Sequence, residues 1–311
     1  MWTGRSLLSM DGADAREARG LLSLAHGDDW RGDELAGKVV ANLFFEDSTR
    51  TRVSFSIAAQ SLGASVVDLT SKGSSVAKGE TLLDTAWTIE AMGVDVLVVR
   101  AGQSGAAAFI DEHTKCAVVN AGDGMHQHPT QAMADALTIG RSFGRFGGVG
   151  GESDWDLSGL KVAIVGDVVS SRVARSNVGL LKALGAEVVL VGPPGMVPGS
   201  LSLLGCSLSH DLDFTLGGVD VVMMLRIQFE RGGGRVLGST REYFARFGMS
   251  AERAGLMKGG GIVMHPGPMN RGVEIASVVA DGEVLGGRSV VLDQVGSGVL
   301  VRKAVLARAG G

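Results

Sequence analysis

One segment of this 311-residue chain places hydroxyl and guanidinium groups at the expected start of a helix. Ser48, Thr49, Arg50 and Thr51 come shortly after the apolar run 39–45, which has the character of a buried strand. A helix N-terminus carries free N–H groups and partial positive charge, so an arginine there is unfavourable unless an anion joins it. N–H groups and hydroxyls donate to phosphate oxygens, and a guanidinium can hold two of them. The segment predicts a phosphate site. The alternative is an ordinary N-cap followed by solvated arginines.

A second polar group precedes another expected helix. His128 stands directly before Pro129, a residue favoured at the first helical position, and Gln131 follows within the first turn. A histidine beside a helix N-terminus tends to stay neutral, and it can donate a hydrogen bond to a carbonyl oxygen that gains charge. This segment alone leaves two equal alternatives, an oxyanion-stabilising histidine and a capping histidine.

Further polar residues lie where loops leave strands. Arg100 directly follows the apolar run 96–99, and the polar loop 71–80 contains Ser74 and Lys78. Taken singly, such cations are more often surface charges than ligands. The loop lacks the residue order of a Walker phosphate loop, and no Gly-x-Gly-x-x-Gly fingerprint follows either candidate strand. The sequence therefore disfavours nucleotide and NAD cofactors.

The second half of the chain offers groups suited to carboxylates. Arg172 lies in a strand-to-helix turn, and Arg226 and Gln228 lie at the end of another apolar run. Near the end of a third run, the turn that contains Gly267 and Pro268 has a rigid backbone whose carbonyl groups can accept hydrogen bonds from an amine. Taken alone, this turn is better explained as an ordinary connection.

The sequence lacks the residue patterns of covalent catalysis and of metal binding. No Ser-His-Asp order or pair of glycosidase-like carboxylates stands out, and His126 and His128 have no third metal ligand nearby in the sequence. Cys116 lies in an apolar run, which indicates a buried thiol rather than a disulfide or a metal ligand. We therefore expect no metal, no other cofactor and no covalent catalysis.

The elements that must position these residues alternate between strands and helices. Val-rich runs separated by amphipathic stretches predict parallel sheets covered on both faces, with ligands beyond the carboxyl ends of the strands. In the first half, each apolar run and the amphipathic stretch that follows it span 39–45 and 53–62, 65–69 and 80–92, 94–99 and 106–113, and 116–120 and 129–139.

A glycine-rich tract separates this series from a second one. The sequence predicts a first domain over 1–140, a connection over 141–159, a second domain over 160–292, and a C-terminal helix over 293–311 that returns to the first domain. The fold class is α/β, with two doubly wound parallel-sheet domains. The second series is expected at 160–165, a helix 172–184, 187–191, 219–225, 261–264 and a helix 273–279.

Composition and charge exclude several classes of protein. The formal net charge is −4 from 29 basic and 33 acidic residues, which argues against a general nucleic-acid binder. No apolar run approaches the length of a membrane span, so no membrane role is expected. Acidic residues appear early in the chain, before any apolar leader segment, and we expect a cytoplasmic protein.

Together, the segment 48–52, the segment 128–131, Arg172, the segment 225–231 and the turn 265–268 resemble the aspartate/ornithine carbamoyltransferase family nearly end to end. The last two resemble its aspartate branch, because the ornithine branch usually has His-Cys-Leu-Pro in that turn. The two carboxylates of L-aspartate also suit arginines. The resemblance implies carbamoyl transfer from carbamoyl phosphate to L-aspartate, an early step of pyrimidine biosynthesis, by direct attack of the amine. Transfer to another amine and a non-catalytic anion-binding scaffold are the alternatives.

The resemblance also implies roles for individual residues. It assigns carbamoyl phosphate to Ser48, Thr49, Arg50, Thr51, Arg100, His128 and Gln131, with Ser74 and Lys78 supplied by a neighbouring subunit. It assigns L-aspartate to Arg172, Arg226, Gln228, Gly267 and Pro268. Arg50, Thr51, Lys78, Arg100 and His128 are the expected catalytic residues. A homotrimer with shared sites follows, and a regulatory chain or a dihydroorotase partner is left open.

Overall fold

The computed structural model describes residues 1–70, 80–147, 154–228, 238–282 and 287–311. Its contacts divide the chain into two compact units, Met1–Leu137 with Gly296–Gly311, and Thr138–Val295. The division lies inside helices α5 (Pro129–Ser142) and α11 (Val291–Gly310), each of which contributes to both units. No helix in the described ranges combines the length and the apolar character needed to cross a membrane.

The first unit is built on a six-stranded sheet with the order β1-β2-β6-β5-β3-β4. All of its pairings are parallel except that of β1 with β2. Besides α5 and α11, its elements are β1 Trp2–Thr3, β2 Ser6–Leu7, α1 Ala15–Gly27, β3 Val39–Phe44, α2 Thr49–Ser61, β4 Ser65–Thr70, α3 Leu82–Ala91, β5 Val96–Ala101, α4 Ala106–His113 and β6 Ala117–Asp123.

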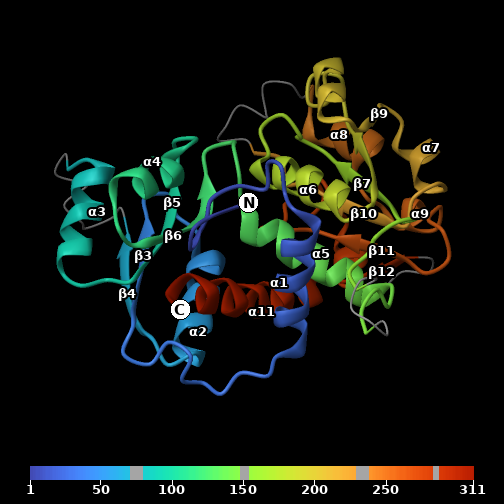
Figure 1. Ribbon diagram of the computed structural model, residues 1–311. Coiled ribbons are helices and arrows are strands. Elements are labelled where there is room, and N and C mark those ends of the chain that lie inside the picture. Colours follow the sequence, from blue (N-terminus) through green and yellow to red (C-terminus); the bar gives the residue numbers. More distant parts are fainter. Residues whose placement is uncertain (71–79, 148–153, 229–237, 283–286) are drawn as a thin grey trace. The chain divides into compact units, whose positions relative to one another are not determined.

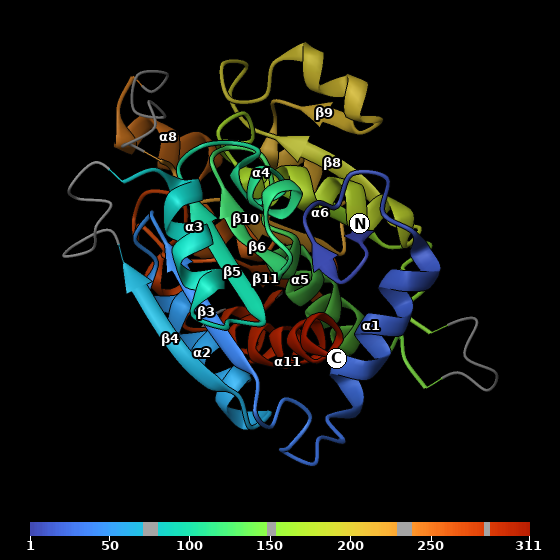
Figure 2. The same ribbon diagram turned by 60° about the vertical axis from the view of Figure 1, so that its left-hand side comes forward.

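Helices cover both faces of this sheet (Figures 1 and 2). On one face, Ile89 of α3 and Ile110 of α4 pack on Leu43, Leu97 and other alternate residues of the strands. Helices α2 and α11 cover the opposite face. Side chains alternate along a strand, so the intervening residues of the strands face these two helices. This coverage explains why the inner strands β3, β5 and β6 are buried on both faces, whereas the edge strand β4 is exposed or half-buried.

The expected C-terminal helix is confirmed, and it packs on the first unit. Arg308 of α11 makes an ion pair with Glu17 of α1, with 3.1 Å between Nη2 and Oε1. The guanidinium of Arg302 lies 5.2 Å from the centre of the Phe55 ring of α2. Helix α11 therefore contacts two helices that lie far from it in the sequence (Figure 1).

The second unit repeats the plan with a six-stranded parallel sheet in the order β12-β11-β10-β7-β8-β9. Its core contains Val165, Val222, Met224, Tyr243 and Phe247. The predicted fold class is thus confirmed. The elements of this unit are β7 Lys161–Val165, α6 Arg172–Ala183, β8 Glu187–Val191, the 3₁₀ helix η2 Gly199–Leu204, β9 Ser207–Ser209, α7 Leu212–Leu216, β10 Val221–Met224, α8 Thr240–Phe247, α9 Ala251–Ala254, β11 Gly261–Met264, α10 Ser277–Ala280 and β12 Gly287–Ser289.

The helix expected over 273–279 is wrong in its first half. Helix α10 begins only at Ser277, because Ile275 bridges in parallel to Met249 and the side chain of Glu274 is bonded to His265. These tertiary contacts override the apolar spacing that predicted the helix.

Helix α1 was missed, although the sequence carried a signal for it. Asp14 is the N-cap of α1, and its side chain accepts a hydrogen bond from the Glu17 N–H. An Asp followed three residues later by Glu, before an apolar periodic run, is a typical helix start.

Helix α5 passes very close to a buried tryptophan in the second unit. Trp155 is 1% exposed, and a Cβ added at Gly140 would lie 2.5 Å from its Cε3 atom. Trp155 also stacks on Phe146, with ring centroids 5.9 Å apart. Only glycine lets the helix backbone approach the ring this closely.

Gly140→Ala is therefore expected to lower the free energy of unfolding. Overpacking costs about 1–3 kcal/mol, which outweighs the gain of about 1 kcal/mol in helix propensity. Denaturant titration measures the change. Gly20→Ala is the matched control, because this exposed glycine of α1 has nothing within 4 Å of an added Cβ. The control is expected to stabilise, and a stabilising Gly140→Ala would contradict the close approach.

Candidate functional site

The strand order of the first unit creates a topological switch point. Strand β3 leads through α2 to β4 on one side, whereas β5, which pairs with β3, leads through α4 to β6 on the other. Loops that leave the carboxyl ends of two such strands diverge, and ligands of open α/β sheets bind there. The segment 48–51 follows β3, and Arg100 is the last residue but one of β5.

Arg100 is held firmly at this switch point. Its carbonyl group accepts a hydrogen bond of 2.8 Å from the N–H of Phe45, which ties β5 to the loop after β3. Its guanidinium donates to the carbonyl oxygen of Ala121 at 3.0 Å and to Glu46 Oε1 at 2.9 Å. Only 11% of its side chain is exposed. The guanidinium is thereby oriented before any ligand arrives.

Helix α2 begins at Thr49, so the arginines of the segment lie in its first turn, as predicted, and this turn contains no acidic residue. Ser48 is the N-cap, but its hydroxyl donates to Thr51 Oγ1 at 3.0 Å instead of capping a backbone N–H. The side chain of the exposed Arg50 makes no hydrogen bond or ion pair with the described part of the chain. Arg52, in contrast, forms an ion pair with Asp68, with 3.9 Å between Nη1 and Oδ2. Of these two arginines, Arg50 is the one available to an anion.

His128 and Gln131 follow the next strand, β6. Pro129 is the first residue of α5, as expected, and His128 is 4% exposed just before it. The side chain of Gln131 donates to Asp135 Oδ1 at 2.8 Å. The predicted residues in the described ranges thus lie at or after the carboxyl ends of three neighbouring strands. Ser74 and Lys78 lie outside the described residues.

The second unit has its own switch point, between β7 and β10. Strand β7 leads through α6 to β8, and β10 leads to β11 on the opposite side. Arg172 is the first residue of α6 and is buried, and Arg226 follows β10. Gln228 Nε2 donates to the Ser170 carbonyl oxygen at 3.2 Å, so the two loops are bonded to each other.

The turn that contains Gly267 and Pro268 follows β11, the strand next to β10. Its Gly267–Pro268 peptide is cis, and the Gly267 N–H donates to Nδ1 of His265 at 2.8 Å. The five residues expected to bind L-aspartate therefore follow three adjacent strands of one sheet.

Sequence reasoning missed Glu46, Asn270 and Glu274. Glu46 lies two residues before Ser48, the first residue of the segment expected to bind phosphate, but only the pairing of β3 with β5 brings it to Arg100. Asn270 and Glu274 contact the loops of the second switch point. The sequence shows Glu274 only as an acidic residue between two apolar ones, and periodicity placed it in a helix. Its burial became visible only in the structure.

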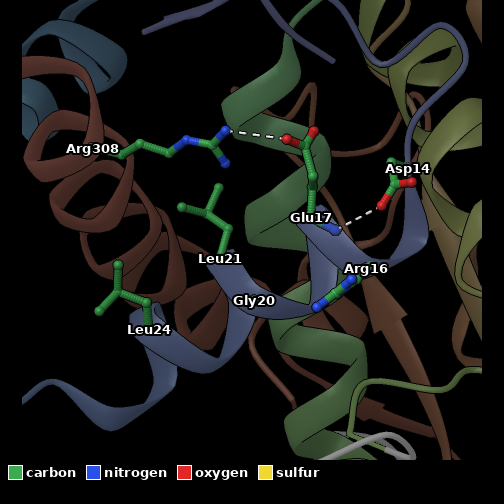
Figure 3. Close-up of a pocket in the computed structure, with 7 residues that line it drawn as sticks. All are labelled: Asp14, Arg16, Glu17, Gly20, Leu21, Leu24 and Arg308. Carbon is green, nitrogen blue, oxygen red and sulfur yellow. Dashed lines mark hydrogen bonds and ion pairs between the residues drawn. The ribbon is translucent and has the colours of Figure 1, made fainter. Parts of the chain in front are cut away.

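An open hollow lies elsewhere, on α1 and the end of α11 in the first unit (Figure 3). Its lining includes Arg16, Leu21 and Leu24, and one rim is the ion pair of Arg308 with Glu17. None of the residues expected to bind substrate lines it. In the described ranges, no group of three or more His, Cys, Asp or Glu is placed to hold a metal ion.

Cys116 is a buried free thiol, as predicted. Burial raises its pKa to about 12, with a further contribution from the carboxylate of Glu90. A thiol must ionise to react, so this cysteine should be inert in the folded protein.

In a Cys206→Ser variant, alkylation of native Cys116 by iodoacetamide is expected to stay slow between about pH 7.5 and pH 9. An ordinary thiol accelerates in this range because it ionises there. Mass spectrometry of time points gives the rate, and unfolding in denaturant should restore fast labelling. A native rate that rises through about pH 8.5 would contradict the raised pKa.

Comparison with known sequences identifies the family of this chain. Residues 5–141 match the model of the aspartate/ornithine carbamoyltransferase carbamoyl-P binding domain, and residues 158–309 match that of the Asp/Orn binding domain. The chain belongs to the aspartate/ornithine carbamoyltransferase family, and the resemblance drawn from the motifs is confirmed.

Its relatives point to one branch of that family. The chain is 52% identical over 306 residues to the aspartate carbamoyltransferase catalytic subunit of Myxococcus xanthus, covering 97% of this chain and 98% of the relative. It is 51% identical to that of Rhodospirillum rubrum, covering 98% and 93%.

Solved structures of both branches share the fold. Aspartate transcarbamoylase from Trypanosoma cruzi, in complex with carbamoyl phosphate and aspartate, has a TM-score of 0.82 and 29% identity over 98% of this chain and 95% of that one. Ornithine carbamoyltransferase from Thermus thermophilus has a TM-score of 0.84 and 28% identity, with both chains fully covered. Fold similarity alone therefore does not separate the two branches, whereas the sequence relatives do.

Proposed function

We propose that this chain transfers the carbamoyl group of carbamoyl phosphate to the amine of L-aspartate, giving N-carbamoyl-L-aspartate and phosphate, an early step of pyrimidine biosynthesis. The first unit binds carbamoyl phosphate through Ser48, Thr49, Arg50, Thr51, Arg100, His128 and Gln131. The second unit binds L-aspartate through Arg172, Arg226, Gln228, Gly267 and Pro268. The cytoplasmic location expected from the sequence belongs to this proposal.

The choice of L-aspartate rests on the two arginines at the switch point of the second unit. Arg172 and Arg226 follow neighbouring strands, and the hydrogen bond from Gln228 to Ser170 joins their loops. Two guanidinium groups suit a dicarboxylate, because each can hold one carboxylate in bidentate geometry. Ornithine, which reacts through its side-chain amine, presents only one carboxylate, and its α-ammonium group would instead call for an acidic residue.

The transfer needs no covalent enzyme intermediate in this proposal. The uncharged amine attacks the carbonyl carbon, a C–N bond forms, and the bond from that carbon to the phosphate oxygen breaks. The amine proton leaves with the phosphate or to solvent. Arg100, Thr51 and His128 stabilise the oxyanion that develops, and positioning of both substrates supplies the rest of the acceleration.

A panel of amines tests the function. The protein is incubated with carbamoyl phosphate and L-aspartate, L-ornithine, N-acetyl-L-ornithine or putrescine, and both carbamoylated product and phosphate are measured. Product with L-aspartate alone is expected. Product with another amine would overturn the roles of Arg172 and Arg226. No product, together with no thermal stabilisation by carbamoyl phosphate or succinate, would favour the anion-binding scaffold.

The proposal includes a homotrimer whose sites are shared between subunits. Lys78 and Ser74 would complete the carbamoyl phosphate site of the neighbouring chain, as the family resemblance implies. A regulatory chain or a dihydroorotase partner stays open.

Hybrid assemblies test the shared site. Arg50→Ala and Lys78→Ala proteins are each expected to be inactive, but a mixed trimer has one site with both native residues. Random reassembly of equal amounts should restore about a quarter of wild-type activity. Size-exclusion chromatography with differently tagged chains verifies that hybrids form. Hybrids without activity would exclude sharing of these two residues.

A further inference from the structure

A buried histidine and glutamate meet beside the second switch point. His265 and Glu274 have no exposed side-chain surface, and His265 Nε2 lies 3.2 Å from Glu274 Oε1. The other ring nitrogen, Nδ1, lies 2.8 Å from the Gly267 nitrogen, which can only donate. Nδ1 is therefore the acceptor, and the Nε2 proton points at Glu274. The carboxyl group of Glu274 thus favours the His265 tautomer with its proton on Nε2. This tautomer leaves Nδ1 free to accept from the Gly267 N–H.

The same carboxyl oxygen holds a second element. Glu274 Oε1 accepts the backbone N–H of Asn270, at the far end of the turn. The side chain of Asn270 then donates from Nδ2 to the carbonyl oxygen of Ile227 at 3.3 Å. Ile227 is buried and stands between Arg226 and Gln228. Asn270 therefore ties the turn after β11 to the segment after β10.

A third link closes the network, since Gln228 Nε2 donates to the Ser170 carbonyl oxygen, two residues before Arg172. The three loops that carry the residues assigned to L-aspartate are thus joined by hydrogen bonds. Burying polar groups carries a desolvation cost, and an apolar core would avoid it. This network carries that cost at the three loops assigned to L-aspartate. Such a network can fix the positions of the loops relative to one another.

We propose that Asn270, oriented by Glu274, is a positioning residue for L-aspartate: it touches no substrate but holds the Ile227 carbonyl group, and with it Arg226 and Gln228, at a set distance from the Gly267–Pro268 turn. The inference rests on the proposed function and adds to it a residue that the substrate-binding set does not contain. It is specific to the L-aspartate half of the site, because none of these contacts involves the first unit.

Asn270→Asp tests the link with minimal change of shape. An aspartate side chain cannot donate to the Ile227 carbonyl group, so the contact is lost. The KM for L-aspartate is expected to rise about five- to tenfold, as for the loss of one oriented hydrogen bond, while the KM for carbamoyl phosphate stays unchanged. Asn270→Ala should give an increase of similar size.

Arg271→Ala is the matched control. Arg271 belongs to the same turn and loses an exposed ion pair with Asp281, but it is not bonded to Ile227. Its KM for L-aspartate should equal that of the unchanged protein. Glu274→Gln provides a second variant, since its amide oxygen still accepts from His265 and Asn270 and should preserve KM within about twofold.

The outcomes separate the inference from the proposed function. The unchanged protein is assayed first, and its failure to carbamoylate L-aspartate would overturn the function. If it is active, an Asn270→Asp KM for L-aspartate equal to that of Arg271→Ala would overturn the positioning role. An equal rise in both substrates' KM values would also overturn it, because that pattern indicates general loosening. A rise confined to L-aspartate, with an unchanged melting temperature, supports it.

Discussion

Arg50→Ala is expected to reduce kcat/KM for carbamoyl phosphate by about 1,000-fold, which corresponds to about 4 kcal/mol of transition-state stabilisation. Arg50 is exposed in the first turn of α2, and the described residues offer it no ion-pair partner. In the proposed site, its removal takes away a bidentate donor to the phosphate group that leaves. Steady-state kinetics with carbamoyl phosphate varied at saturating L-aspartate measures the loss.

Two companion variants make this result specific. Arg50→Lys keeps the charge but not the fork of donors, so it should recover only part of the activity. Arg52→Ala removes a guanidinium from the same helix, but this one lies 3.9 Å from Asp68 and should cost less than about threefold. Equal losses in Arg50→Ala and Arg52→Ala would show that the general positive charge of the helix matters rather than one positioned side chain.

Arg226→Ala is expected to raise the KM for L-aspartate by about 100-fold or more, corresponding to about 3 kcal/mol. In the proposed site, the variant loses a charge-assisted contact with one substrate carboxylate. Arg226 belongs to the loop that Gln228 bonds to the Ser170 carbonyl oxygen. Stabilisation by succinate in a thermal shift assay should disappear, whereas stabilisation by carbamoyl phosphate should remain.

The Arg271→Ala protein again serves as a control, because it also loses one guanidinium from the second unit. It should keep the wild-type KM and the response to succinate. If Arg226→Ala retained its affinity for L-aspartate but accepted ornithine, Arg226 would act in selecting the substrate rather than in binding it. If neither property changed, the assignment of Arg226 to a carboxylate would be wrong.

Local chemistry could be predicted from the sequence, because it depends on neighbours along the chain. The place of Ser48 as the N-cap residue of α2 and of Pro129 as the first residue of α5 agrees with residue preferences at helix starts, although the Ser48 hydroxyl caps no N–H group. Alternating apolar strands and helices likewise indicated two parallel-sheet units. The buried thiol of Cys116 followed from the apolar run around it.

Apolar spacing failed where distant contacts decided the backbone. Residues 273–276 have the spacing of a helix, yet Ile275 bridges to Met249 and Glu274 turns to His265. Periodicity describes which face of a segment is apolar, but it does not contain the partners that compete for the segment's polar groups.

The sequence by itself determined which groups are available: a helix start with hydroxyls and a guanidinium, a His-Pro helix start, and arginines at strand ends. Only the tertiary structure decided which of them meet. Arg172 and Arg226 follow strands that are separated in the sequence and become neighbours through the pairing of β7 with β10. The contact of Glu46 with Arg100 depends in the same way on β3 and β5. Strand order results from many weak burial contacts between distant segments, and no short stretch of sequence carries that sum.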